Sequence, residues 1–397
     1  MNKSTPPPQP VRLTDRSTLN STIEVLEQHF DLSADGYLCQ TRDLWQVLVA
    51  VCARQSTVES TCNDLEDAPD SNTIRAYLNQ QLKPENILTL QRESNEALAS
   101  QLPSWLWDHP KEVACDLHEE PYYGEYDKED PDNWVCGGEA RDGTTHFYCC
   151  ATAYIIHRGE RMTLAVEFVN PKTDLSLVLQ HLLERVKELG IPFKSLFLDK
   201  GFCSIPIMAN LLTQGLPVLL AAPIKGKKGG TRALCHGRGS YFTQHTFRSQ
   251  KNGQLTVPVA VVRTFAKRRH GPPKAQWLVY VLLNMPDLLI RAVRKTYRRR
   301  FGIESSYRMM EKARPRTTSH NAALRFLFMG LALILLNIWI ALQWTYLRIQ
   351  GSGPRRVANQ YFRQDRMQRF LSRAVEAVYS VVTMVDPPNV KPFFSNL

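Results

Sequence analysis

Three carboxylates in this sequence stand where metal-assisted chemistry would need them. Asp116 ends the apolar run EVACD, and Asp199 ends a second apolar run, KSLFLD. Glu304 follows much later, in the basic stretch YRRRFGIESSYRMMEK at 297–312, which we expect to form one helix. Because Mg²⁺ prefers oxygen ligands and keeps several waters, a few carboxylates and a substrate phosphate suffice to hold it.

Such a set of carboxylates suits phosphodiester chemistry. That chemistry needs an activated oxygen nucleophile, stabilisation of charge on the phosphoryl group and help for the leaving oxygen, and two Mg²⁺ ions about 3.5–4 Å apart supply all three. We interpret Asp116 as the bridging ligand, with Asp199 and Glu304 each holding one ion, and Mn²⁺ as a substitute. Taken singly, each carboxylate is better explained as structural, in a turn or a surface ion pair. Their joint placement on two strands and a later basic helix reverses that preference.

The order of predicted elements tells how two of these residues meet. Apolar strands are expected at 112–116, 146–157 and 162–169, followed by an amphipathic helix at 174–190 and a strand at 194–199. Three antiparallel strands, a crossover helix and a parallel strand form a ribonuclease H-like α/β core, and its first and fourth strands are neighbours at the centre of the sheet. The two aspartates therefore end side by side.

The chain of 397 residues, 43% of them hydrophobic, is long enough for several domains. We expect a helical N-terminal domain, a catalytic core split by a β-rich insertion, and a C-terminal helical tail. The predicted boundaries are a disordered lead-in at 1–17, the helical domain at 18–105, the core at 106–222, the insertion at 223–285, the second part of the core at 286–348 and the tail at 349–397.

Positive charge points to a polyanionic partner. The net charge is +11, and RAVRKTYRRR at 291–300 holds six cations in ten residues. Nucleic acid is a better match than a membrane surface. Around Glu304, arginines suit bidentate contacts to phosphates, and tyrosines can donate a hydrogen bond or stack. The alternative is a solvated basic helix. The predicted DNA-binding residues are Tyr297, Arg298, Arg300, Arg308 and Lys312.

Two other segments are candidate DNA contacts. Residues 56–82 have the pattern of a helix, a turn and a second helix. They could form a helix-turn-helix motif that binds a DNA end, or an ordinary pair of helices. Its outward residues would be Asn72, Thr73, Arg75 and Asn79. The β-rich segment would present basic loops, or else be an ordinary β subdomain with charged loops. Those loop residues are Lys225, Lys227, Lys228 and Lys267 to His270.

The cysteines and one apolar segment argue against a disulfide-bonded, a zinc-binding and a membrane protein. Nine cysteines without a CxxC pair suit a reducing cytoplasm. Cys149 and Cys150 point to opposite faces of a strand, so we interpret them as packing residues and not as zinc ligands. The run at 326–343 has the length of a membrane span, but Asn337 interrupts it. We expect a buried core helix and no membrane association.

The motifs resemble those of the DDE transposases of prokaryotic insertion sequences. VACDLHEEPYYG surrounds Asp116, LFLDKGF surrounds Asp199, and Tyr297-x2-Arg300-x3-Glu304 is similar to the family's YREK signature. The resemblance extends over residues 110–345. It departs at the last position of the signature, because Glu311 stands where the family has a basic residue, and Lys312 follows one residue later.

The resemblance implies a set of functional expectations. Tyr297 and Arg300 would contact the element end, and Lys312 or Arg308 would supply the final cation. A Mg²⁺-dependent enzyme would cleave the ends of its element and transfer the strand into target DNA, working in the cytoplasm on the nucleoid as a homodimer or larger synaptic complex. The competing functions are a transposase-derived DNA-binding protein that does not cleave, and a metal-dependent nuclease that does not join strands.

Overall fold

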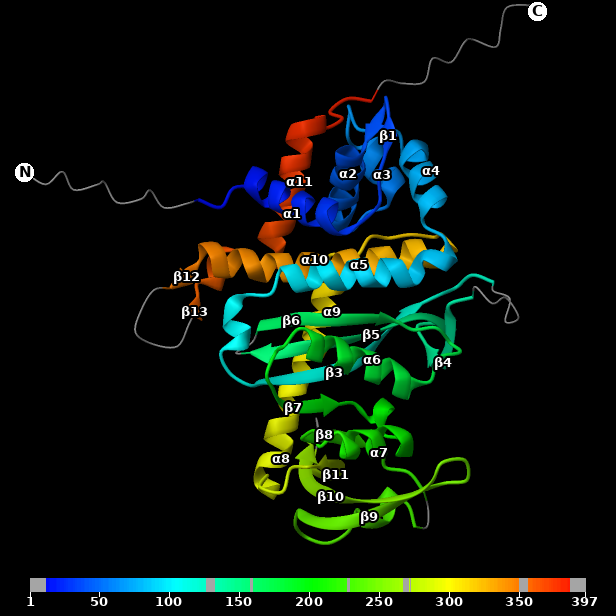
Figure 1. The fold of residues 1–397 in the computed structure, drawn as a ribbon, viewed down its shortest axis with the longest axis vertical. Coiled ribbons are helices and arrows are strands. Elements are labelled where there is room, and N and C mark those ends of the chain that lie inside the picture. Colours follow the sequence, from blue (N-terminus) through cyan, green and yellow to red (C-terminus); the bar gives the residue numbers. More distant parts are fainter. Residues whose placement is uncertain are drawn as a thin grey trace, which may run out of the picture.

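The computed structural model describes residues 12–125, 133–157, 160–226, 229–266, 271, 273–349 and 356–385, and of residues 157, 160, 161, 301, 303 and 304 only the backbone. Within these residues, nine strands form one central sheet (Figure 1). In spatial order they are β4 (Val135–Arg141), β5 (Thr144–His157), β3 (Lys111–Pro121), β7 (Phe193–Leu198), β8 (Val218–Ala222), β11 (Lys274–Leu283), β10 (Gly253–Ala266) and β9 (Tyr241–Ser249), with β6 (Glu160–Phe168) also paired to β5.

The predicted order of strands around the two aspartates is confirmed. β3 pairs with β5 and β5 with β6, both antiparallel, while β7 lies parallel to β3 and β8 parallel to β7. β4 was not predicted. It shares the outer edge of β5 with β6, and its sequence VCGGEAR is polar, glycine-containing and mostly exposed. A strand with no buried face leaves no alternating apolar pattern in the sequence.

The first strand is longer than its apolar run predicted. β3 continues beyond Asp116 to Pro121, because its antiparallel pairing with β5 extends as far as Pro121 opposite Phe147. The parallel pairing with β7 stops earlier, at Cys115 opposite Leu198. Asp116 therefore does not end its strand, as the sequence suggested. It is the first residue beyond the stretch that β3 shares with β7.

The segment predicted as a β-rich insertion continues the central sheet. β11 pairs antiparallel with β8, and β10 lies between β11 and β9. Alternate residues of β10, among them Val257, Val259 and Val261, are fully buried. Of the predicted basic loop residues, Lys225 is described, whereas Lys227, Lys228 and Lys267 to His270 lie outside the described residues.

Helices cover both faces of the sheet. α6 (Leu175–Glu188) and α7 (Ile205–Thr213) pack over the residues of β3 and β7 that include Val113 and Leu198. α8 (Ile290–Tyr297) packs on the other face, over Ala114 and Phe197. Side chains alternate between the faces of a strand. The face of Ala114 and Phe197 is therefore also the face on which Asp116 and Asp199 lie.

The N-terminal helices and the C-terminal helix form one helical layer at the end of the molecule opposite β9 (Figure 1). α11 packs on α1 and α2, so the predicted tail belongs to this layer. The first helix begins at Asp15, three residues earlier than predicted, because Thr14 caps it through the amide of Ser17. The helices of this layer are α1 (Asp15–His29), α2 (Thr41–Arg54), α3 (Val58–Asn63), α4 (Ser71–Gln81) and α11 (Gln364–Tyr379). α5 (Ile87–Ser100) lies closer to the sheet and packs on β6 (Figure 1).

Short elements complete the chain. Two small hairpins are β1 (Asp35–Gly36) with β2 (Cys39–Gln40), and β12 (Arg348–Ile349) with β13 (Arg356–Val357). The 3₁₀ turns are η1 (Pro84–Asn86), η2 (Ser104–Trp107), η3 (Lys200–Phe202), η4 (Thr231–Leu234), η5 (Arg298–Phe301) and η6 (Asn359–Tyr361).

The long apolar helix, α10 (Ala322–Tyr346), lies between the helical layer and the sheet (Figure 1). It is apolar and long enough to cross a membrane. In its most apolar stretch of 18 residues, however, 89% is buried inside the protein. The predicted burial is therefore confirmed. Asn337 explains the polar interruption. Its amide accepts from Thr163 N at 3.0 Å and donates to Thr163 O at 2.8 Å, which satisfies the backbone of one residue on the open edge of β6.

Candidate active site

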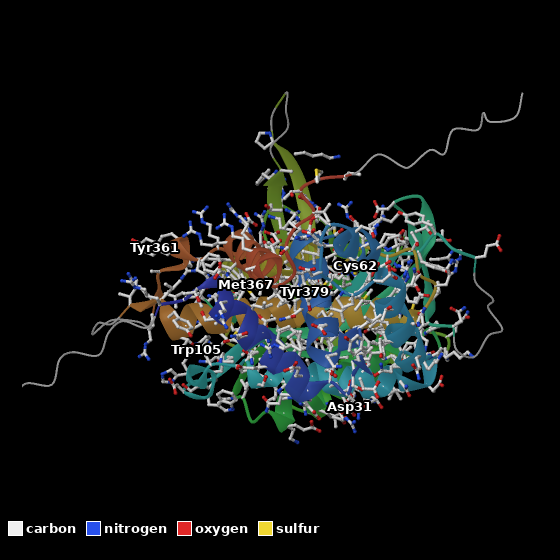
Figure 2. The ribbon with its side chains drawn as sticks, turned by 90° about the horizontal axis from the view of Figure 1, so that it is seen from above. Asp31, Cys62, Trp105, Tyr361, Met367 and Tyr379 are labelled. Carbon is white, nitrogen blue, oxygen red and sulfur yellow. The ribbon has the colours of Figure 1, made fainter. Side chains whose placement is uncertain are left out.

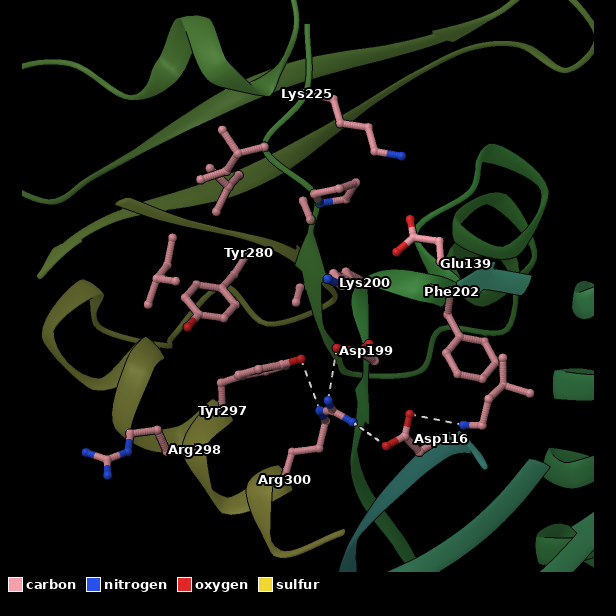
Figure 3. A pocket seen from close by; sticks show the side chains of 18 of the residues that line it. Asp116, Glu139, Asp199, Lys200, Phe202, Lys225, Tyr280, Tyr297, Arg298 and Arg300 are labelled. Atoms are coloured by element: carbon pink, nitrogen blue, oxygen red, sulfur yellow. Dashed lines mark hydrogen bonds and ion pairs between the residues drawn. The ribbon is translucent and has the colours of Figure 1, made fainter. Parts of the chain in front are cut away.

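The two aspartates meet on one arginine. Arg300 Nη1 lies 3.0 Å from Asp116 Oδ2, and Arg300 Nη2 lies 2.9 Å from Asp199 Oδ1 (Figure 3). The parallel register of β3 and β7 sets the two residues side by side, and the guanidinium fork spans both carboxylates. The predicted meeting of Asp116 and Asp199 is thus confirmed, with a cation held between them.

A chain of hydrogen bonds fixes the arginine. Arg300 Nε donates to the Tyr297 hydroxyl at 3.0 Å, and that hydroxyl donates to Leu198 O at 3.1 Å. Burial raises the pKa of Tyr297, so the hydroxyl stays neutral and keeps its proton for the carbonyl. Burial acts to lower the pKa of Arg300, but the Tyr297 oxygen and the two carboxylates raise it by more, and the guanidinium remains charged.

Both signature residues are turned inward. Tyr297 is 3% exposed and Arg300 is 5% exposed, so neither presents an open surface to DNA while Arg300 holds the aspartates. Their predicted role as contacts to DNA stays a prediction. The geometry shows that they hold Asp116, within β3, and Asp199, just beyond the end of β7.

The basic segment is not the single helix that the sequence predicted. α8 ends at Tyr297, the 3₁₀ turn η5 follows, and α9 (Gly302–Glu311) begins after it. Residues three apart are aligned in a 3₁₀ turn, because it has three residues per turn. This alignment brings Arg300 back over Tyr297, with its Cζ 5.6 Å from the centre of the tyrosine ring.

Glu304 lies in the first turn of α9, and its side chain is outside the described part of the structure. The third carboxylate therefore stays a prediction. α9 itself is fixed against β3 near Asp116. The Tyr307 hydroxyl donates to Asp116 O at 3.2 Å and lies 2.8 Å from the Thr152 hydroxyl of β5, which donates to it. Burial raises the pKa of Tyr307 and keeps it neutral.

Alternate residues of β3 continue the contacts with this segment. His118 follows Asp116 on the same face, with its ring 4.9 Å from that of Tyr307 and its Nε2 3.2 Å from Glu311 Oε1. The hydrogen bond from His118, together with Arg314, lowers the pKa of Glu311. Glu311, which stands where the resemblance expects a cation, thus lies against His118 and Arg314 of its own chain. Sequence analysis missed this pairing, although DLHEEP alternates polar residues with the period of a strand.

Glu120 is the next residue on that face, and it is 6% exposed. It forms ion pairs with Arg314 and with Arg325, whose Nη1 lies 3.2 Å from Glu120 Oε1. Arg325 also donates from Nε to Ser319 O at 2.7 Å. These contacts fix the connection between α9 and α10 on the strand that carries Asp116.

We expect the Glu120→Gln substitution to lower the free energy of unfolding by about 3 kcal/mol, because it leaves buried Arg325 without its counter-charge and half-buried Arg314 with Glu311 alone. Glu119→Gln is the matched control, since Glu119 is the neighbouring residue on the opposite face. Its partner Arg141 lies 2.9 Å away and is half exposed, so its loss should remain below about 1 kcal/mol. Urea denaturation measures both, and equal losses would contradict the role of Glu120.

Asp116 and Asp199 line a large basic cleft with a volume of about 1310 Å³. Its walls come from β3, β8, β11, α8 and the turn after β7 (Figure 3). Arg298 lines it as the sequence suggested, and so does Lys225. Lys200 and Arg294 also line the cleft, although sequence analysis did not single them out. Six lysines and arginines line the cleft against four acidic residues, which are Asp116, Asp199, Glu119 and Glu139. This excess of positive charge suits a phosphate-bearing ligand.

The other two predicted DNA-binding residues are not among those that line the cleft. Arg308 is exposed on α9. Lys312 is exposed beyond the end of α9, and its Nζ lies 3.9 Å from Asp365 Oδ1. Lys312 lies close to α11, since Gln368 of that helix donates to Lys312 O.

Asp116 and Asp199 are two of the three carboxylates expected to bind a divalent cation. Within the described side chains, no group of three or more histidines, cysteines or acidic residues could hold a metal ion. Asp116 and Asp199 supply carboxylate oxygens converging on a positive charge, which suits Mg²⁺. Cys149 and Cys150 are buried in separate apolar clusters, which confirms their interpretation as packing residues.

The possible DNA-reading motif has the wrong charge. Asn72, Arg75 and Asn79 are exposed on α4, as predicted, but Arg75 is held by its own helix, donating to Asn72 Oδ1 at 2.8 Å. Residues 12–105 contain 7 lysines and arginines against 14 aspartates and glutamates, a net charge of −7. Such a surface repels phosphates, so the geometry favours an ordinary helical pair.

The fold is similar to that of a solved transposase. The cryo-EM structure of the piggyBac transposase synaptic complex with hairpin DNA matches with a TM-score of 0.53 and 12% sequence identity, covering 92% of this chain and 77% of that chain. No protein-family model and no curated protein sequence matches. At this identity the likeness concerns the fold alone, and the large mixed sheet is consistent with a ribonuclease H-like transposase core.

Proposed function

We propose that this protein is a Mg²⁺-dependent DDE transposase of the kind found in prokaryotic insertion sequences. It would bind the ends of its element, cleave phosphodiester bonds there and transfer the strand into target DNA. The observation that carries the proposal is the convergence of Asp116 and Asp199 at the floor of a basic cleft. The fold shared with a transposase supports it.

In this function Asp116, Asp199 and Glu304 hold the metal. When bound, two Mg²⁺ ions supply an activated oxygen nucleophile and take up charge on the leaving oxygen, and Mn²⁺ is a substitute. The protein's own residues do the positioning. Tyr297 and Arg300 fix the two aspartates, and Tyr307 holds the backbone of β3 at Asp116.

The cations of the cleft would receive the DNA backbone. Lys200, Lys225, Arg294 and Arg298 line the cleft, and phosphate contacts of this kind set the position of a duplex without reading its sequence. Tyr297 and Arg300 are proposed to reach DNA only after Arg300 leaves the aspartates. The partners are the element ends and the target duplex. The working form is a homodimer or larger synaptic complex on the nucleoid of the cytoplasm, without membrane association.

A joining assay tests this function. The full chain is incubated with Mg²⁺, a supercoiled plasmid and labelled duplexes taken from the DNA that flanks the coding sequence. The expected product is a labelled end joined to the plasmid. Cleavage without joining would make the protein a nuclease, and tight binding without cleavage in Mg²⁺ or Mn²⁺ would make it a DNA-binding protein only.

A further inference from the structure

α11 carries a row of arginines on the face turned away from the protein. Its buried face, which includes Met367, Leu371 and Val375, packs in the helical layer. The exposed arginines stand three, three and four residues apart, so they share one side of the helix. At 1.5 Å per residue, the row is about 15 Å long. This α11 arginine stripe consists of Arg363, Arg366, Arg369 and Arg373.

In the part of the chain that the structure describes, the stripe forms no ion pair. Within the described residues, none of its four guanidinium groups lies within ion-pair distance of a carboxylate. Two of them are held only by carbonyls of their own segment, Arg366 by Tyr361 O at 2.8 Å and Arg369 by Asp365 O at 3.1 Å. Four neighbouring positive charges repel one another, so the stripe is expected to have an anionic ligand.

A neighbouring arginine shows the contrast. Half-buried Arg54 of α2, beneath α11, is paired with Glu376 at 2.9 Å and with Asp64 at 2.7 Å. The exposed acidic residue of α11 closest in sequence to the stripe, Asp365, lies 3.9 Å from Lys312 Nζ. The four arginines of the stripe therefore remain available to a ligand from outside.

The stripe is continuous with the basic segment at 297–312. Gln364 donates to Met309 O at 2.6 Å, and Gln368 donates to Lys312 O, so α11 is fastened to the end of α9. Exposed Arg308 and Lys312 lie at this junction. In Figure 1, α8, α9 and α11 follow one another along the long axis of the molecule. In Figure 2, α11 lies on the side toward which the β10–β11 hairpin projects, and side-chain nitrogens gather between Tyr361 and Met367.

We propose that the α11 arginine stripe binds the phosphate backbone of duplex DNA, on a path that runs from the cleft along α9. The proposal rests on the proposed function in taking DNA as the ligand. Guanidinium groups bind phosphates bidentately and stay charged at any working pH, which suits a stripe made of arginine alone. The competing ligand is the acidic helical layer of a second copy.

The test is binding of a 30-base-pair duplex of arbitrary sequence to the full chain, measured by fluorescence anisotropy in EDTA over a range of salt concentrations. The variant carries Arg363→Gln, Arg366→Gln, Arg369→Gln and Arg373→Gln. Each phosphate contact contributes about 0.9 to the salt slope. We therefore expect the slope to fall by about 3 to 4, and the affinity to fall about 100-fold at 0.15 M salt.

The control has the same change of charge elsewhere: Lys172→Gln, Lys187→Gln, Lys194→Gln and Lys251→Gln, all at exposed positions. Its duplex affinity should fall at most a few-fold. Because all eight positions are exposed, both variants should keep the thermal unfolding midpoint of the parent, which checks that they fold.

Two results would overturn the proposal. The first is a stripe variant with the duplex affinity and salt slope of the parent. The second is the same unchanged binding combined with a smaller assembly in analytical ultracentrifugation, which would assign the stripe to a second copy. A weaker-binding stripe variant of a protein that fails the joining assay would support the stripe and refute the transposase, so the two proposals fail separately.

Discussion

The Asp116→Asn and Asp199→Asn variants are expected to join DNA strands about a thousand-fold more slowly than the unaltered protein. Each substitution removes a charged oxygen ligand from the proposed metal site, and the loss of several kcal/mol of transition-state stabilisation corresponds to a factor of this size. Duplex affinity in EDTA should stay the same or increase, because a negative charge leaves the floor of the cleft. The joining assay and anisotropy measure the two effects.

Glu139→Gln is the control for this prediction. Glu139 of β4 lines the same cleft and is not one of the carboxylates bound by Arg300 (Figure 3). We expect joining within about three-fold of the parent, since a carboxylate outside the metal site makes no large contribution. Glu304→Gln completes the series as the third proposed ligand. If both aspartate variants keep joining rates within ten-fold of the parent, the proposed metal site is wrong.

The Arg300→Met substitution is expected to lower the free energy of unfolding in EDTA by about 3 kcal/mol. Arg300 is buried, and its removal leaves two carboxylates facing each other without the charge that neutralises them. Added Mg²⁺ should restore part of the loss, because a ligand that binds only the folded state stabilises it. Urea denaturation in EDTA and in MgCl₂ measures both effects.

Arg299→Met provides the comparison in the same turn. Arg299 pairs with Glu112 near the surface, and its side chain is 49% exposed. Its loss should be below about 1 kcal/mol and should not depend on Mg²⁺. Should Arg300→Met prove as stable as the parent in EDTA, the guanidinium would not be what holds the aspartates together.

The sequence by itself determined the elements that position the aspartates. Apolar runs with a strand's composition and an amphipathic helix between them are local patterns, and their order along the chain implied that β7 lies beside β3. The structure confirms that neighbourhood and the meeting of Asp116 and Asp199. The burial of α10 was also predictable, because a long apolar run has few ways to avoid water.

The tertiary structure decided which partner each polar residue takes. Because Arg300 is close in sequence to a proposed catalytic carboxylate, we predicted that it binds a phosphate of DNA. In the structure it holds two aspartates that are far from it in the chain. Glu311 stands at the position where the resemblance predicted a basic residue, and in the structure its carboxylate contacts His118. Asn337, which the sequence showed only as an interruption of an apolar run, hydrogen-bonds the backbone of Thr163 on the open edge of β6.

These outcomes share a physical reason. The period of apolar residues reports only whether a segment is helix or strand and which face is buried. The choice between an internal ion pair and an external ligand depends on contacts between residues far apart in sequence, and so on the register of β3 with β7 and on the 3₁₀ turn at η5. The sequence therefore determined that the two aspartates lie side by side, whereas the packing of α8 and α9 on the sheet determined which cation holds them together.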